Sequence, residues 1–173
     1  MKVAYLCENI GNYKPCINQH PMLLNEIKEE IRTYVSPRIE QCFSELKNEI
    51  EKKKGTVSYG PMSVDVLLGP TRVYLKIDKK ITVKNWDDTR TFDSLSFEMV
   101  NPVYDLANVA IEIASQEAKY CYFEYVGYMV LYPQFDIRVH MMSDSTSIYT
   151  IKDKKSGKEM NIAIRSCAIP PGI

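Results

Sequence analysis

The hydrophobic pattern changes its period at Gly55, and this change constrains the fold more than any other feature of the sequence. Before Gly55, apolar side chains recur every three or four residues through 22–54, which predicts an amphipathic helix. After it, apolar and polar residues alternate through 56–100, which predicts an antiparallel β-meander with one apolar face. Because the helix is the natural cover for that face, we expect an α+β fold with antiparallel sheet covered by amphipathic helices.

A proline lies in the middle of the predicted helix, at Ser36-Pro37. Proline removes an amide donor and clashes with the preceding turn, so we expect a kink there, or a restart of the helix with Ser36 as its N-cap. The apolar stripe keeps its phase across the proline. Both halves of the helix should therefore cover the same surface.

The remaining segments complete one expected compact domain of 173 residues. Asn101-Pro102 is a cap followed by a proline, which predicts a second helix. The aromatic stretch 121–132 fits a helix and a strand equally well, and three short strands should follow it. The expected order is an irregular disulfide-bearing lead-in over 1–21, a kinked helix over 22–54, the meander over 56–100, a helix over 101–120, and the aromatic segment with C-terminal strands over 121–173.

Five cysteines are present, and this odd number leaves at least one thiol without a disulfide partner in the chain. Cys7 and Cys16 enclose a short segment with Gly, Asn and Pro, which makes them the first expected disulfide. Cys121 and Cys167 form the second, because this bond would tether the C-terminal segment. Cys42 then has either a partner upstream of this chain or the role of a buried free thiol. Disulfides favour an oxidising, extracytoplasmic compartment.

A metal site is the alternative use of the same cysteines. Cys7, Cys16, His20 and Cys42 would supply four zinc ligands, although the Cys-x8-Cys-x3-His spacing departs from that of common zinc loops. A thiol-dependent enzyme would instead pair a cysteine with His20 as its base. We assign no catalytic residue, and we expect no cofactor unless the zinc alternative holds.

The charge balance and the aromatic residues indicate which kinds of partner the chain could bind. Lys and Arg number 22, as do Asp and Glu, so no surplus positive charge favours nucleic acid. Trp86, Tyr122, Tyr125 and Tyr128 form a candidate recognition surface, and the Tyr-rich run would also suit a membrane-facing belt. Packing in the core and at its rim is the other use of these rings.

No stretch of the sequence approaches the roughly 18 to 20 apolar residues of a membrane-spanning helix, and the N-terminus lacks the apolar core of a signal peptide. Read literally, this indicates a cytoplasmic protein. A secreted domain given without its leader would look the same. The location is therefore open at this point.

Several stretches resemble a family of uncharacterised single-pass membrane proteins of small-genome archaea. They are Tyr-Leu-Cys at 5–7, Cys-Ile-Asn-Gln-His-Pro-Met at 16–22, the helix through Cys42, Gly-Pro-Met-Ser-Val-Asp-Val-Leu-Leu at 60–68, and Asn-Pro-Val-Tyr-Asp-Leu-Ala-Asn-Val-Ala-Ile-Glu-Ile-Ala at 101–114. The resemblance implies an N-terminal membrane anchor, which this chain lacks, followed by an extracytoplasmic domain of unknown function. It carries over no site residues.

Taken together, these features predict a non-enzymatic extracytoplasmic domain of a membrane-anchored cell-surface protein that acts by binding or assembly. Its expected partner is another protein or a second copy at the cell surface, with membrane contact only through the absent N-terminal anchor. One alternative is a cytoplasmic zinc-stabilised or thiol-dependent enzyme using Cys16, His20 and Cys42. A second is a structural component of a phage or virion.

Overall fold

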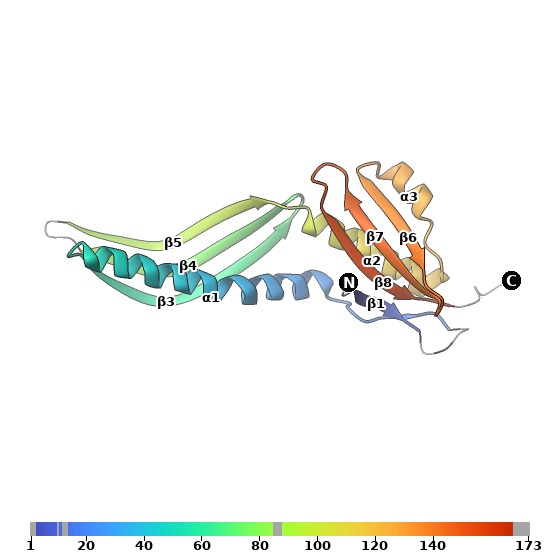
Figure 1. Ribbon diagram of the computed structural model, residues 1–173, viewed down its shortest axis with the longest axis horizontal. Helices are drawn as coiled ribbons and strands as arrows, with labels where there is room; N and C mark the ends of the chain where they lie inside the picture. Colours follow the sequence, from blue (N-terminus) through green and yellow to red (C-terminus); the bar gives the residue numbers. More distant parts are fainter. Residues whose placement is uncertain (1–2, 10, 12–13, 85–87, 168–173) are drawn as a thin grey trace. The chain divides into compact units, whose positions relative to one another are not determined.

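The chain divides into two compact units, each with its own core. The computed structural model describes residues 3–9, 11, 14–84 and 88–167. Unit 1 consists of Met1–Leu24 together with Asn101–Ile173, and unit 2 consists of Asn25–Val100 (Figure 1). The α+β class with antiparallel sheets covered by helices is as expected. Unit 2 is thus inserted in the sequence between the two parts of unit 1.

Unit 1 contains a five-stranded sheet in the order β2-β1-β8-β7-β6. β1 and β8 run parallel, and the other neighbours run antiparallel. The three C-terminal strands lie where the sequence places them. The strands of this sheet are β1 (Ala4–Glu8), β2 (Ile17–Asn18), β6 (Phe135–Met141), β7 (Thr146–Asp153) and β8 (Glu159–Arg165).

The expectation that 1–21 is irregular is wrong, because this segment contains β1 and β2. β1 takes its hydrogen-bonding partner from the far end of the chain, where Ala4 lies opposite Ile162 of β8. A five-residue strand followed by glycine and proline gives little periodicity, and its partner cannot be identified from neighbouring residues. Only the folded sheet therefore reveals these strands.

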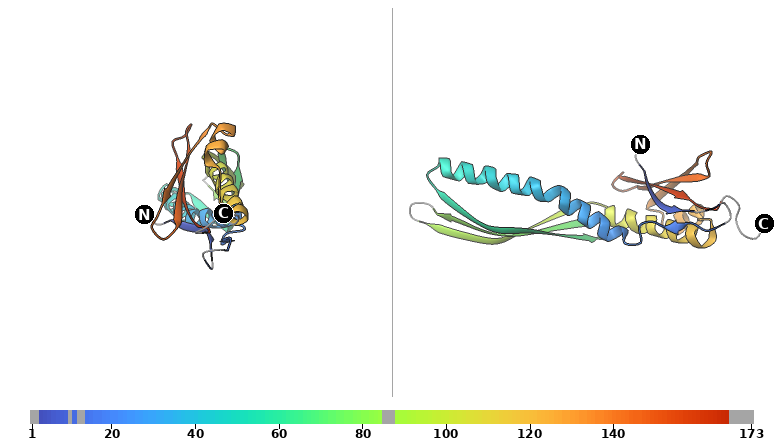
Figure 2. Two further views of the ribbon diagram at one scale, coloured as in Figure 1. Left: turned by 90° about the vertical axis from the view of Figure 1, so that its right-hand side faces the viewer. Right: turned by 90° about the horizontal axis from the view of Figure 1, so that it is seen from below.

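Two helices, α2 (Val103–Tyr120) and α3 (Tyr125–Leu131), pack on the sheet of unit 1 (Figure 2). Cys121 ends α2 in the left-handed conformation, with φ 55°. The Glu124 side chain then accepts hydrogen bonds from the amides of Val126 and Gly127 and caps α3. The sequence fits a helix and a strand equally well in this aromatic segment. The cap explains why part of it forms a short helix.

The core of unit 1 lies between α2 and the sheet. The buried side chains of α2 repeat at helical spacing and meet isoleucines of three strands. Ile113, Ile151 and Ile164 have no exposed surface. Burial of this apolar surface is the main force that holds the helix on the sheet.

Unit 2 joins one long helix to a three-stranded antiparallel sheet, as the change of period predicts. α1 (Leu23–Lys52) lies along one face of β3 (Thr56–Gly69), β4 (Arg72–Lys84) and β5 (Thr89–Val100) (Figure 2). The core between them contains Phe43 from the helix and four strand residues, Val57, Val64, Ile77 and Ile81. The helix therefore covers the part of the apolar face that β3 and β4 form.

α1 continues through Pro37 without a break. The Ser36 hydroxyl donates to the carbonyl of Arg32, 2.6 Å away, and so does not cap a new helix. The expected restart at Ser36 is wrong. Val35 and Ile39, on either side of the proline, both pack against the core of unit 2, so both halves of the helix cover the same surface, as expected.

Replacement of Ile151 by Ala tests the core of unit 1. Ile151 is 0% exposed, so the cavity left by the substitution should lower the free energy of unfolding by about 2–5 kcal/mol. Urea denaturation followed by circular dichroism measures this change. Val130→Ala is the control, because Val130 is 76% exposed and its truncation should cost less than about 0.5 kcal/mol. Equal effects of the two substitutions would contradict this description of the core.

Candidate functional site

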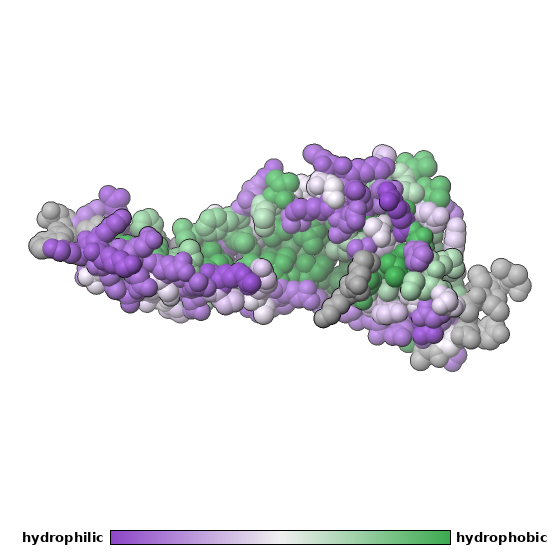
Figure 3. Space-filling view, viewed as in Figure 1, coloured by the Kyte–Doolittle hydropathy of each residue, from purple (hydrophilic) through white to green (hydrophobic). Residues whose placement is uncertain are grey.

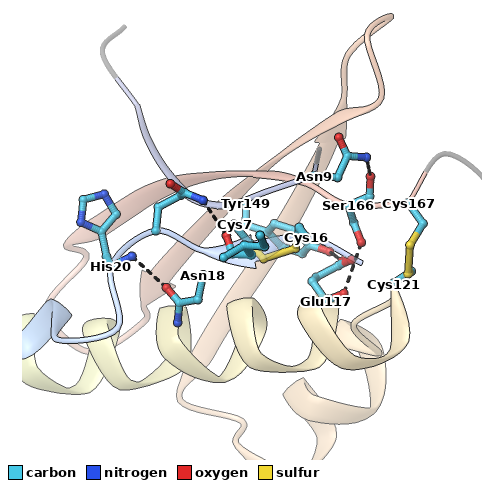
Figure 4. The surroundings of a disulfide bond; sticks show 12 residues. Cys7, Asn9, Cys16, Asn18, His20, Glu117, Cys121, Tyr149, Ser166 and Cys167 are labelled. Carbon is cyan, nitrogen blue, oxygen red and sulfur yellow. Dashed lines mark hydrogen bonds between the residues drawn. A yellow bond between two sulfur atoms is a disulfide. The ribbon is translucent and has the colours of Figure 1, made fainter. Parts of the chain in front are cut away.

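The first disulfide joins β1 to the segment just before β2. The sulfurs of Cys7 and Cys16 are 2.02 Å apart, and their Cα atoms are 5.3 Å apart. Both residues are buried in the core of unit 1, close to α2 (Figure 4). The bond is the pair expected first from the sequence. It links the two arms of the short N-terminal hairpin of β1 and β2.

The second disulfide joins the end of α2 to the segment after β8. Cys121 is the residue that ends the helix, and Cys167 follows β8 by two residues. The bond closes a sequence separation of 46 residues. It is the second pair that the sequence predicts. Both disulfides lie in unit 1, and disulfides of this kind are typical of proteins in oxidising compartments.

Cys42 lies on α1 in unit 2 and is a free, exposed cysteine. The interpretation of Cys42 as a buried thiol is therefore wrong. The next residue, Phe43, is the one that enters the core. The stripe assigned from the sequence runs through Cys42 and leaves out Phe43, and the packing reverses these two positions. The partner upstream of the chain stays a prediction.

The four residues of the zinc alternative do not form a ligand set in this structure. Cys7 and Cys16 are bonded to each other, so neither is a thiolate. His20 follows β2, and its amide donates to the side-chain oxygen of Asn18 at 2.9 Å (Figure 4). Cys42 belongs to unit 2. Within the part of the chain that the structure describes, no three His, Cys, Asp or Glu side chains gather into a possible metal site.

A buried polar pair lies beside the second disulfide. The Tyr149 hydroxyl of β7 donates to the Glu117 carboxylate of α2, and the two residues are 3% and 5% exposed (Figure 4). Burial raises the pKa of Tyr149, and the hydrogen bond to Glu117 raises it further. The Ser166 hydroxyl donates to the Glu117 carbonyl at 3.3 Å. Glu117 follows Ile113 by one helical turn, so its place on the apolar stripe was a signal that the sequence analysis missed.

The structure separates the residues of the candidate recognition surface. Trp86 lies outside the described residues. Tyr122 is exposed, and its hydroxyl donates to Glu124 at 2.6 Å. Tyr125 and Tyr128 are half-buried against the core of unit 1, as the core-and-rim alternative describes. Tyr122 is thus the only one of the three described tyrosines that lies mainly on the surface.

Two other exposed apolar surfaces were not found from the sequence. One is the outer side of α3, where Val126, Val130 and Leu131 are exposed. The other is β5, in which all residues except Leu95 are exposed. Periodicity assigned the apolar residues of β5 to the covered face of the meander, but it does not show how far the cover extends. These two surfaces are the candidate binding sites of the protein.

The two disulfides should differ in their contribution to stability. In the chain-entropy description, the longer loop closed by Cys121–Cys167 is worth about 4 kcal/mol and the shorter loop closed by Cys7–Cys16 about 3 kcal/mol. Replacement of each pair by Ala, followed by urea denaturation, measures both. The Cys42→Ala chain serves as the background and control, since Cys42 forms no disulfide. Retention of wild-type stability after loss of either pair would contradict the structural role of that bond.

The Tyr149–Glu117 pair should make stability fall at alkaline pH. The folded pKa of Tyr149 is raised above the unfolded value of about 10. The pair's contribution is therefore complete below pH about 10 and is lost as the pH rises beyond it, because only the unfolded state then releases the proton. Urea denaturation at a series of pH values should show this slope in the wild type. The slope should be weaker in Tyr149→Phe, and an unchanged slope would contradict the prediction.

Comparisons of the chain with protein-family models, curated proteins and solved structures find no match. In the described residues, no helix combines the length and the apolar character needed to cross a bilayer. The interpretation of the sites therefore depends on their geometry and chemistry.

Proposed function

We propose that this chain is a non-enzymatic extracytoplasmic domain of a membrane-anchored cell-surface protein and that it acts by binding or assembly. The two intramolecular disulfides support the oxidising compartment. The resemblance to single-pass membrane proteins supports the anchor, which would lie outside this chain. The partner is another protein or a second copy of the chain.

The exposure of β5 is the main observation that supports binding or assembly. β5 lies at the edge of its sheet, and Phe92, Phe97, Met99 and Val100 are about half exposed or more. Figure 3 shows hydrophobic surface between β5 and α1. An edge strand presents unpaired backbone donors and acceptors, and its apolar side chains add area to any strand that pairs with it.

The two edges of this sheet differ in their protection. β3 contains Gly60-Pro61 at the point where its pairing with β4 shifts, and a proline on an edge strand hinders pairing with another chain. β5 carries the charged residues Arg90, Asp93 and Glu98 but contains neither proline nor lysine. The β5 edge is therefore the one suited to accept a strand from a partner.

Thiol trapping tests the compartment. Intact cells that make the protein are treated with a membrane-permeant maleimide before lysis, and the mass of the protein is measured with and without prior reduction. We expect one alkylated thiol, Cys42, and two disulfides that react only after reduction. Alkylation of all five cysteines without reduction would contradict the extracytoplasmic proposal.

A charged substitution in β5 tests assembly. Phe97→Lys should weaken self-association at least about tenfold, because it replaces an exposed apolar ring of this edge strand by a charge. Native mass spectrometry and sedimentation velocity measure the oligomers. Leu67→Lys on β3 is the matched control, because Leu67 is exposed to a similar extent, at 62% against 55% for Phe97. A chain that stays monomeric at high concentration, or equal effects of the two substitutions, would contradict assembly through β5.

A further inference from the structure

α3 presents an apolar surface that is exposed among the described residues of unit 1. Val130 and Leu131 are each 76% exposed, and Val126 is 54% exposed. The segment from Tyr125 through Phe135 contains no charged residue. Tyr122 and Tyr132 flank this surface with half-exposed rings. The other side of the helix packs against the core, so the apolar residues on the outer side are left largely exposed among the residues that the structure describes.

A lysine-rich turn lies directly beside the C-terminal end of α3. The Lys154 ammonium donates to the carbonyl of Pro133 at 2.8 Å, and the Lys154 amide donates to the carbonyl of Gln134 at 2.9 Å. These bonds fix the turn between β7 and β8 next to the loop that follows α3. Figure 3 shows the hydrophobic residues of α3 close to the hydrophilic residues of this turn.

The turn carries a local excess of positive charge. Residues 152–159 contain four lysines, one aspartate and one glutamate, which gives a net charge of +2 (4 − 2). Lys152 pairs with Glu159 at 3.2 Å, and the Asp153 carboxylate accepts the amide of Ser156 within the turn. Lys155 and Lys158 are exposed and lie in none of the described ion pairs.

We propose that this end of unit 1 binds the surface of an anionic phospholipid bilayer. An apolar protrusion bordered by lysines is complementary to such a surface. Aliphatic side chains enter the boundary of the acyl chains, while the long lysine side chains reach the headgroup phosphates. Tyrosine rings have a favourable position at the level of the headgroups. Val130 and Leu131 are the inserted residues, and Lys155 and Lys158 make the electrostatic contacts.

This contact is distinct from both the anchor and the β5 surface. The proposed anchor lies outside the chain, whereas α3 and the turn belong to unit 1. β5 belongs to unit 2. The binding of lipid and the assembly through β5 therefore make separate predictions, and either can fail without the other.

Sedimentation with lipid vesicles tests the proposal. The disulfide-bonded chain is mixed with vesicles of phosphatidylcholine that contain phosphatidylglycerol, and with vesicles of phosphatidylcholine alone. We expect binding to the anionic vesicles that weakens as sodium chloride is raised, because salt screens the lysine contacts. Absence of binding, or equal binding to both kinds of vesicle, would overturn the proposal.

Substitutions assign the contact to the two elements. The double variant Val130→Glu with Leu131→Glu should abolish binding, and Lys155→Glu with Lys158→Glu should weaken it at least about tenfold. Met141→Glu is the matched control: Met141 is 74% exposed and lies at the far end of β6 from α3. It should bind as the wild type does. Binding that survives the α3 double variant, or that is lost equally in the control, would overturn the assignment.

A gain of signal avoids dependence on loss-of-function variants. Leu131→Trp should show a blue shift of tryptophan emission when anionic vesicles are added, measured against the parent chain with its single Trp86. Sedimentation velocity without lipid tests the alternative, in which a second copy of the chain covers α3. If Val130→Glu with Leu131→Glu dissolves an oligomer of the wild-type chain, then a second copy covers α3 and the lipid proposal is wrong. Phe97→Lys should bind vesicles normally, which separates this result from assembly through β5.

Discussion

The parallel pairing of β1 with β8 is the constraint on which unit 1 depends. It brings segments from the two ends of the chain into adjacent positions of one sheet, so that Ala4 lies opposite Ile162. Closure of so long a loop costs conformational entropy, which the contacts within unit 1 must offset. The sequence between them folds into unit 2, which acts as a structured insertion. Pairing of β1 with β8 therefore joins the two separate stretches of sequence that form unit 1.

Both disulfides lie at peripheral segments of unit 1, one in the N-terminal hairpin and one after the last strand. The short hairpin of β1 and β2 is fastened by Cys7–Cys16, and the end of β8 is fastened to α2 by Cys121–Cys167. Unit 2 has a different basis of stability, because β3, β4 and β5 are consecutive strands joined by short connections. Local hairpins require little loop closure, and among its described residues the only cysteine is free. Disulfides thus reduce the conformational entropy that unit 1 loses on folding, whereas the local strand pairing of unit 2 keeps its loss from loop closure small.

The two exposed apolar surfaces have different physical characters. β5 offers backbone hydrogen bonds along a strand edge together with its side chains, which is a geometry for another extended chain. α3 has its backbone groups satisfied within the helix and offers only side chains, beside a basic turn. The first surface is directional and the second is not. This difference is the reason for assigning a protein partner to one and a lipid surface to the other.

Local periodicity predicted the elements that are long or strongly patterned. The helix over 22–54 appears as α1, and the meander appears as β3, β4 and β5 with nearly the same bounds. The cysteine partners followed from loop composition and chain position. The aromatic stretch could not be assigned, because its outcome depends on the single cap that Glu124 provides.

The sequence by itself determined the α+β class, the long helix with its sheet, and the candidate disulfide partners, because each depends on residues close in the chain or on the chemistry of one residue type. Only the tertiary structure decided the strands β1 and β2, the exposure of Cys42, the buried pair of Glu117 and Tyr149, and the place of Lys154 beside Pro133. These features depend on which distant segments meet in space. Hydrophobic period carries no record of that, because it reports which face of an element is apolar and not what lies against it.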